Sequence, residues 1–91
     1  MMKRRKRRKG KGLCYPGYNW CGPGCSGPSA PTNEVDSCCR KHDYCYEQYG
    51  PIKKCDEMLL VCLQSKINHR TKMGKDARLF YNIMRLKYDL N

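Results

Sequence analysis

Residues 36–46 read Asp36-Ser37-Cys38-Cys39-Arg40-Lys41-His42-Asp43-Tyr44-Cys45-Tyr46, and the cysteine spacing here says most about how the chain folds. Cys38 and Cys45 are seven residues apart, as are Cys55 and Cys62 further along. Seven residues make about two turns of an α-helix, so each pair lies on one face of its helix. If the two helices run antiparallel across their short connection, Cys45 meets Cys55 and Cys38 meets Cys62. We therefore predict an antiparallel helix pair crosslinked at two levels.

The other four cysteines tie the N-terminal part of the chain to this helix pair. Eight cysteines permit 105 pairings, so spacing alone rarely settles them. Cys39 points about 100° away from Cys38 on the same helix, so it is free to reach a cysteine elsewhere, and we pair it with Cys21 in the preceding segment. Cys14 and Cys25 then remain as a fourth pair.

The composition agrees with a small crosslinked domain. The 91 residues correspond to about one domain, and only 13 of them are Leu, Ile, Val or Phe. With a net charge of +11, so few large apolar residues would be typical of a disordered chain. The eight cysteines reverse that interpretation, because small domains with little core substitute crosslinks for apolar burial. The length excludes Rossmann and barrel enzymes, and no apolar run reaches the ~18 residues of a membrane span.

Proline and glycine divide the chain into elements. Residues 13–32 hold four prolines and four glycines, which predict an irregular loop. A first helix is expected from Asn33, as its cap, to about residue 48, and a second over 53–68. A third is expected to begin near Asp76 as its cap, with apolar residues at helical spacing: Leu79, Phe80, Ile83, Met84 and Leu90. The predicted fold class is small, disulfide-rich and all-α.

Residues 1–12 differ from the rest in charge. Lysine and arginine fill eight of these positions, all between residues 3 and 11. Like charges in a block repel and stay solvated, so we expect a flexible basic arm before a domain of residues 13–91. Its partner would be a polyanion: nucleic acid, a nuclear import receptor reading residues 3–9, or an anionic lipid surface. A merely solubilising tail is the alternative.

The start of the chain and its cysteines indicate different compartments. Met1 and Met2 lead directly into the basic block with no apolar stretch after it, so no secretory signal peptide is expected. Disulfides nonetheless need an oxidising environment. We expect either a missing leader or maturation inside a particle that later leaves the cell. Metal-binding cysteines in a reducing cytosol are the alternative.

The same helix register brings two titratable side chains together. On an ideal wheel, His42 lies about 50° from the Cys38/Cys45 seam and Asp56 about 110° from its own, in the same rotational sense. In an antiparallel pair, equal senses of rotation place both side chains on one flank. A carboxylate on one ring nitrogen sets the tautomer and leaves the other nitrogen to take a proton from water. Two solvated polar residues beside the disulfides are the plainer alternative.

The loop contains a second candidate site. Trp20-Cys21-Gly22-Pro23-Gly24 is a glycine-punctuated turn that can aim backbone carbonyls at one point, as a hard cation requires. If Cys21 is linked to Cys39, this turn is tied one helical turn from Asp43. The carboxylate of Asp43 would then complete the ligand set.

These motifs resemble a known family. Residues 36–46, the Cys-Gly-x-Gly turn before them and Cys55-Asp56 after them are similar to the active-site helix, calcium loop and closing aspartate of secreted phospholipases A2. Residues 16–24 and 31–36, with the short link between the helices, resemble the phospholipase A2 domain in the unique region of parvovirus VP1 capsid proteins. Together the matches cover about residues 15–62.

The resemblance implies calcium-dependent hydrolysis of the sn-2 ester of glycerophospholipids. It implies that His42 is the general base on a water, that Asp56 orients His42, and that Tyr46 hydrogen-bonds Asp56. Calcium would be held by the carboxylate of Asp43 and by three backbone carbonyls, those of Trp20, Gly22 and Gly24. With the Gly22 amide, the ion would stabilise the oxyanion. An extracellular or virion-associated location is expected.

The expected partner is a phospholipid membrane or micelle surface, bound peripherally, because the substrate lies in such an aggregate. Tyr15, Tyr18 and Trp20 cluster around the loop and would suit an anionic interface. Packing of these rings inside the fold is the alternative.

Two other functions remain as hypotheses. One is a catalytically silent phospholipase-like toxin or binding module, although His42 and Asp43 are both present. The other is a zinc-binding, nucleic-acid-associated protein with four ligands on one helix: Cys38, Cys39, His42 and Cys45. The spacing argues against it, because adjacent cysteines on a helix do not point at one tetrahedral centre.

Overall fold

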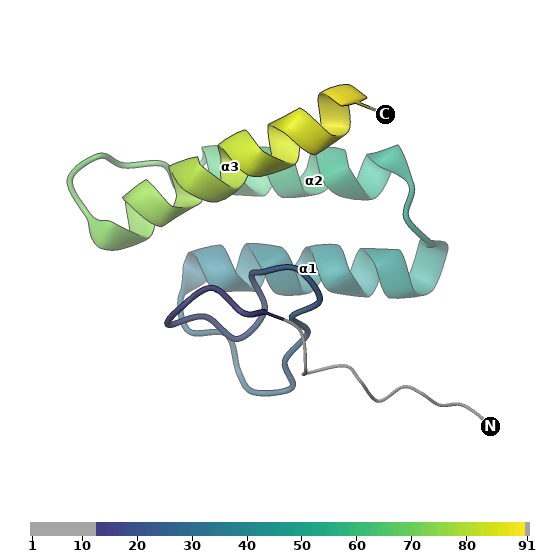
Figure 1. The fold of residues 1–91 in the computed structure, drawn as a ribbon, viewed down its shortest axis with the longest axis horizontal. Helices are drawn as coiled ribbons and strands as arrows, with labels where there is room; N and C mark the ends of the chain where they lie inside the picture. The colour runs from purple at the N-terminus through teal and green to yellow at the C-terminus, as the bar shows by residue number, and fades with distance from the viewer. Residues whose placement is uncertain (1–12, 91) are drawn as a thin grey trace.

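The computed structural model describes residues 13–90 and contains three helices in that range. They are α1 (Glu34–Tyr49), α2 (Lys53–Gln64) and α3 (Lys72–Leu90). Figure 1 shows α1 and α2 antiparallel, with α3 running along α2 and the loop of residues 13–32 lying against α1. The described part of the chain has no strand, so the all-α fold class is confirmed. The predicted basic arm, residues 1–12, lies outside the described residues.

The bounds of α1 lie close to those predicted, with Asn33 as the predicted N-cap. Asn33 precedes the helix, and its side chain accepts a hydrogen bond from the Asp36 amide at 2.8 Å. Such a bond satisfies one of the free amides of the first helical turn. At the other end, Gly50 has φ +85° and its amide reaches the Tyr46 carbonyl. Only glycine adopts that conformation without strain, so the helix ends at Tyr49, one residue beyond the predicted end near residue 48.

The predicted end of α2 and start of α3 are wrong. α2 ends at Gln64 rather than near residue 68. Just after this end, the Ser65 hydroxyl donates a hydrogen bond to the Cys62 carbonyl at 2.7 Å. Serine side chains compete in this way with the helical hydrogen bonds of the backbone. α3 begins at Lys72, and the side chain of Thr71 caps it by accepting the Gly74 amide at 2.9 Å.

Asp76, the predicted cap of α3, is instead a buried residue inside the helix. Its carboxylate accepts hydrogen bonds from the Tyr18 hydroxyl at 2.7 Å and from Lys72 Nζ at 2.8 Å. The first of these bonds joins α3 to the loop. A cap had been inferred from residue type alone, whereas the loop contact that uses this carboxylate exists only in the folded chain.

All four predicted disulfides are confirmed. Cys38–Cys62 and Cys45–Cys55 crosslink α1 to α2, with Cα atoms 5.8 and 5.7 Å apart. Cys21–Cys39 ties the loop to α1, and Cys14–Cys25 closes the loop on itself. No cysteine is free. The zinc hypothesis is therefore wrong, because its ligands need cysteines as thiolates.

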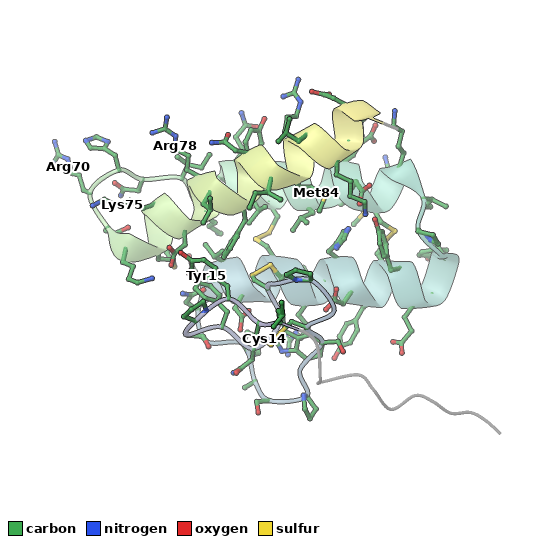
Figure 2. All side chains as sticks on the ribbon, in the orientation of Figure 1. Cys14, Tyr15, Arg70, Lys75, Arg78 and Met84 are labelled. Atoms are coloured by element: carbon green, nitrogen blue, oxygen red, sulfur yellow. A yellow bond between two sulfur atoms is a disulfide. The ribbon has the colours of Figure 1, made fainter. Side chains whose placement is uncertain are left out.

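The core is small and draws on the loop aromatic residues. Tyr18 and Trp20 are buried together with cystines and with apolar residues of all three helices: Val35, Leu59, Leu63 and Ala77. The Trp20 indole donates to the Ser29 carbonyl at 2.7 Å, and Tyr15 packs edge-on against Phe80 beneath α3 (Figure 2). The membrane contact predicted for Tyr18 and Trp20 is thus wrong, and the packing alternative is confirmed for them.

Candidate active site

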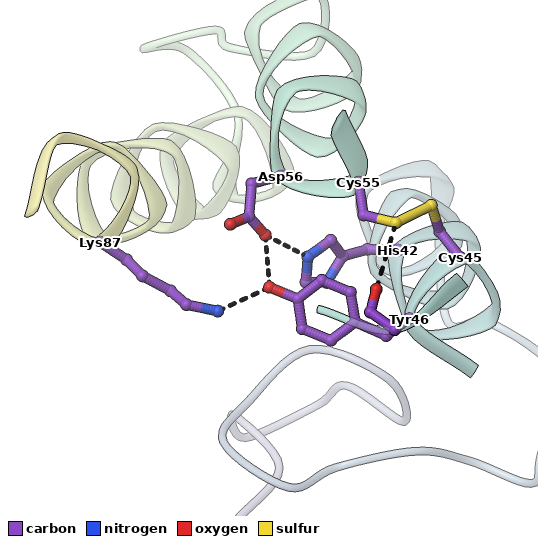
Figure 3. Close-up of polar contacts among 7 residues, drawn as sticks. His42, Cys45, Tyr46, Cys55, Asp56 and Lys87 are labelled. Atoms are coloured by element: carbon purple, nitrogen blue, oxygen red, sulfur yellow. Dashed lines mark hydrogen bonds and ion pairs between the residues drawn. A yellow bond between two sulfur atoms is a disulfide. The ribbon is translucent and has the colours of Figure 1, made fainter. Parts of the chain in front are cut away.

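α1 and α2 place His42 and Asp56 in direct contact. The Nε2 atom of His42 lies 2.8 Å from Oδ1 of Asp56 (Figure 3). The two side chains come from neighbouring helices whose register is set by Cys38–Cys62 and Cys45–Cys55. The predicted convergence of imidazole and carboxylate is therefore present, and both groups lie on one flank of the helix pair.

Two further side chains extend this contact into a series of hydrogen bonds, here called the polar chain, which joins His42, Asp56, Tyr46 and Lys87. The hydroxyl of Tyr46 donates to the same Oδ1 of Asp56 at 2.6 Å, and Lys87 Nζ donates to the Tyr46 hydroxyl at 2.6 Å. The Lys87 ammonium also lies 4.9 Å from the centroid of the Tyr46 ring, a cation–π distance. Lys87 was missed because it lies on α3, whose position no motif in the sequence indicates.

Burial and hydrogen bonding together set the charge states of His42 and Asp56. The side chain of Asp56 is 2% exposed and that of His42 is 10% exposed. Burial lowers the pKa of His42 below its ordinary value of 6.5, and Asp56 opposes this only in part. Burial alone would raise the pKa of Asp56, but hydrogen bonds from Tyr46 and His42 hold it below its ordinary value. Near neutral pH the pair is therefore a neutral imidazole beside a carboxylate.

These charge states set the tautomer of His42. A carboxylate has no proton to give, so Nε2 of the neutral ring carries the proton and donates a hydrogen bond to Asp56. The lone pair then lies on Nδ1, as a base acting on water requires.

The turn that the sequence predicts as a cation site contains two glycines with positive φ. Gly22 and Gly24 have φ of +133° and +75°, a region that favours glycine. A Cβ atom on Gly22 would lie 2.1 Å from the Leu13 carbonyl oxygen, so the backbone at residue 22 packs directly on residue 13. The disulfide from Cys21 ends at Cys39, one helical turn before Asp43.

The carbonyls that lie between the predicted ligands in sequence accept hydrogen bonds from the start of the loop. The Cys21 and Pro23 carbonyls accept the amides of Tyr15 and Leu13, both at 2.9 Å. The predicted ligands are the other three carbonyls, and that of Gly22 accepts only the Cys25 amide at 3.0 Å among the bonds described. A carbonyl oxygen has two lone pairs, so one remains for a cation. The Gly22 carbonyl therefore keeps a lone pair of the kind that an oxygen-ligated ion such as calcium uses.

The acidic and sulfur-bearing side chains do not by themselves form a metal centre. Among residues 13–90, no group of three His, Cys, Asp or Glu side chains is placed to hold a metal ion. Any cation in the loop would thus depend mainly on backbone oxygens, which suit calcium better than zinc.

Asp36 is a structural residue that sequence reasoning missed. It is fully buried, and its two carboxylate oxygens accept four backbone amides between 2.8 and 3.0 Å. Three of these amides belong to the loop at residues 19–21 and the fourth to Thr32. Asp36 therefore sets the loop against the start of α1, and an acid in the first turn is the signal that could have suggested such a role.

A shallow groove runs along the helix pair formed by α1 and α2. Its volume is about 420 Å³, and residues of α1 and α2 alone line it, including the cysteines of both interhelical disulfides. Met58 and Val61 lie at its exposed edge. Of the four residues in the polar chain, only His42 lines the groove.

Comparison with known proteins places the chain in a family. A model for a phospholipase A2-like domain matches residues 11–87. An acidic phospholipase A2, S17-58, from Austrelaps superbus is 46% identical over 52% of this chain and 30% of its own length. Probable phospholipase A2 homolog 1 from Oryza sativa subsp. japonica is 33% identical over 76% of this chain and 48% of its own. Capsid protein VP1 of porcine parvovirus strain NADL-2 is 31% identical over 76% of this chain and 10% of its own.

The chain spans less than half the length of these curated relatives. Some of their names carry the word homolog, as for the taipoxin gamma chain of Oxyuranus scutellatus scutellatus, so membership alone does not establish hydrolysis. No solved structure matches the chain significantly. The family model covers most of the sequence and includes the helix pair, the loop and most of α3. The chain therefore belongs to the phospholipase A2-like domain family.

Proposed function

We propose that this protein is a calcium-dependent phospholipase A2 that hydrolyses the sn-2 ester of glycerophospholipids. The observation that carries the proposal is the buried contact of 2.8 Å between His42 Nε2 and Asp56 Oδ1. A buried imidazole held by a carboxylate is the arrangement that a general base needs. Family membership supports the choice of reaction.

In the proposed mechanism, His42 takes a proton from water at Nδ1 while the water oxygen attacks the ester carbon. Asp56 keeps the ring in the correct tautomer and stabilises the imidazolium that forms. Tyr46 holds the Asp56 carboxylate by its hydrogen bond. The protonated His42 then returns its proton to the leaving glycerol oxygen, so lysophospholipid and fatty acid are the products. No serine or cysteine nucleophile is needed.

Calcium is the proposed cofactor. The carboxylate of Asp43 and the carbonyls of Trp20, Gly22 and Gly24 would hold it, and the bound ion would supply positive charge to the ester oxygen. The Gly22 amide is the proposed second donor to that oxygen. Asp36 supports this loop through its three amide contacts at residues 19–21.

The proposed partner is the surface of a phospholipid membrane or micelle, bound peripherally. No helix within residues 13–90 is long and apolar enough to cross a membrane. The four disulfides favour an oxidising compartment, so we propose an extracellular or virion-associated protein. The polyanion partner of residues 3–11 remains a proposal from charge alone.

Release of fatty acid from phospholipid vesicles tests the function. We expect release with calcium and none with a chelator in excess. His42→Gln and Asp56→Asn should each reduce the rate by about 10²–10⁴-fold, the usual contribution of acid–base catalysis. Equal release with calcium and with chelator would contradict the calcium dependence. No release by the oxidised wild-type protein would instead favour a catalytically silent binding module.

A further inference from the structure

α3 carries apolar side chains on two opposite faces. On one face, Ala77 is buried and Phe80 and Met84 pack against the core. On the other, Leu79, Ile83 and Leu86, here called the outer stripe, are 39%, 56% and 67% exposed. These three side chains fall within about 60° on a helical wheel, about 160° from Ala77. The outer stripe therefore lies outside the core cluster that holds α3 to the fold.

Cations flank this outer stripe. α3 contains five lysines and arginines against two aspartates, a net charge of +3. Both aspartates already face a cation, in Lys72–Asp76 at 2.8 Å and Arg85–Asp89 at 3.4 Å. Figure 2 shows Lys75 and Arg78, with Arg70 just before α3, extending away from the body of the molecule. An exposed apolar stripe edged by basic residues is typical of a helix that lies in a membrane interface.

We propose that the outer stripe of α3 is the surface by which this protein docks on an anionic lipid bilayer. Charge complementarity selects this occupant. The basic arm of residues 1–12 carries eight lysines and arginines and would be repelled by α3. A second copy would likewise set the cations of one α3 against those of the other. Anionic headgroups instead attract each nearby lysine or arginine while the acyl region receives the aliphatic side chains.

This docking surface lies beside the candidate active site. Lys87, on the edge of α3 between the outer stripe and the buried face, reaches the Tyr46 hydroxyl. α3 is thus the wall of the site on that side, as Figure 3 shows. A bilayer on the outer stripe would lie within about one helix diameter, ~10 Å, of the polar chain. The inference rests on the proposed function for its choice of lipid, but docking itself requires no hydrolysis.

Co-sedimentation with vesicles tests the inference. The vesicles are pure phosphatidylcholine or an equal mixture of phosphatidylcholine and phosphatidylserine, and all variants carry His42→Gln so that hydrolysis cannot alter the lipid. The test variant is Ile83→Ser with Leu86→Ser. The matched control is Met58→Ser with Val61→Ser on α2, whose side chains are 53% and 68% exposed, against 56% and 67% for the test pair. Circular dichroism confirms that each variant is helical, and the mass of the intact protein confirms that its four disulfides have formed.

The expected result is binding to the mixed vesicles that the test variant weakens at least about tenfold, since each lost aliphatic group removes apolar surface from the interface. The control variant should bind like its parent. Lys75→Gln and Arg78→Gln should each weaken binding to the mixed vesicles about fivefold. Added salt should also weaken this binding, because it screens the attraction between the cations and the headgroups. Equal binding by the test variant and its parent would overturn the proposal. So would a loss confined to the control, or a loss of self-association in the test variant without a loss of vesicle binding.

Discussion

The ammonium of Lys87 lies 2.6 Å from the hydroxyl oxygen of Tyr46, although the two residues are 41 positions apart in the sequence. Tyr46 gives its only hydroxyl proton to Asp56, so its oxygen is available as the acceptor for Lys87. The two bonds run in one direction, from Lys87 through Tyr46 to Asp56, and His42 donates to the same carboxylate oxygen. A positive charge on α3 is therefore coupled to the pair on α1 and α2.

Replacing Lys87 with methionine should shift the pH dependence of hydrolysis. The Lys87 charge lowers the pKa of both His42 and Asp56, so its removal should raise the pKa of His42. The acidic limb of the kcat/KM profile then moves to higher pH, with a loss of less than about tenfold at neutral pH, since an exposed charge acts weakly. Lys53→Met is the matched control, because the Lys53 ammonium lies over the ring of Tyr88 and is not among the groups that shift the pKa of His42 or Asp56. Identical profiles for Lys87→Met and wild type would show that Lys87 has no effect on the pair.

The His42–Asp56 pair should also make stability depend on pH. The folded pKa of His42 lies below 6.5, so between the two values the unfolded chain binds a proton that the folded chain does not. The free energy of unfolding therefore falls as pH drops below 6.5, by up to about 1.4 kcal/mol per pH unit. Asp56 acts in the same direction at lower pH, since its folded pKa lies below 3.8 and the stability it contributes is lost as pH falls through that folded value.

Denaturant unfolding of the oxidised protein at a series of pH values measures this dependence. His42→Gln should remove the slope below pH 6.5, whereas His69→Gln, at an exposed position in the turn before α3, should retain it. A slope that survives in His42→Gln would assign the effect to other groups.

Asp36→Asn should loosen the loop. Four backbone amides donate to the Asp36 carboxylate in a fully buried position, and an amide side chain can accept only some of these bonds. We expect a loss of unfolding free energy on the order of 3 kcal/mol, because hydrogen bonds to a buried charge are strong. Asp89→Asn, which removes an exposed ion pair on α3, should change it by less than about 1 kcal/mol. Chemical denaturation of both variants decides, and equal stabilities would refute the anchoring role.

Calcium should stabilise the folded protein independently of any hydrolysis. An ion that binds only the folded state at a hundredfold excess over its Kd adds about 2.7 kcal/mol. The melting temperature should therefore rise with calcium, and Asp43→Asn should remove most of the rise while Asp89→Asn leaves it intact. A calcium-induced rise of the same size in the Asp43 variant would exclude this carboxylate as a ligand.

The helix pair and the contact between His42 and Asp56 could be predicted because they depend on short-range periodicity. The seven-residue intervals at Cys38/Cys45 and Cys55/Cys62 set the face of each helix, and the crosslinks then set their register. With the register known, the flank shared by His42 and Asp56 follows from helical geometry alone. The helix start at Asn33 could also be predicted, since capping depends only on neighbouring residues.

The errors arose where several residues of suitable type compete. Asp76 and Thr71 are both good N-cap residues, and Thr71 has the role because Asp76 is drawn into a contact with Tyr18 across the fold. Tyr18 and Trp20 could face either lipid or core, and a chain with few aliphatic residues uses them as core. Residue type allowed both outcomes in each case, and packing chose between them.

The amino-acid sequence by itself therefore determined the helix pair crosslinked by Cys38–Cys62 and Cys45–Cys55 and the meeting of His42 with Asp56, because helical periodicity acts over short distances. Tertiary structure alone decided which apolar face of α3 is buried, and hence that Lys87 reaches Tyr46 while Leu79, Ile83 and Leu86 remain outside. The physical reason is that α3 is apolar on two sides and joined to the pair by no disulfide, so only the shape of the surface beneath it selects its orientation.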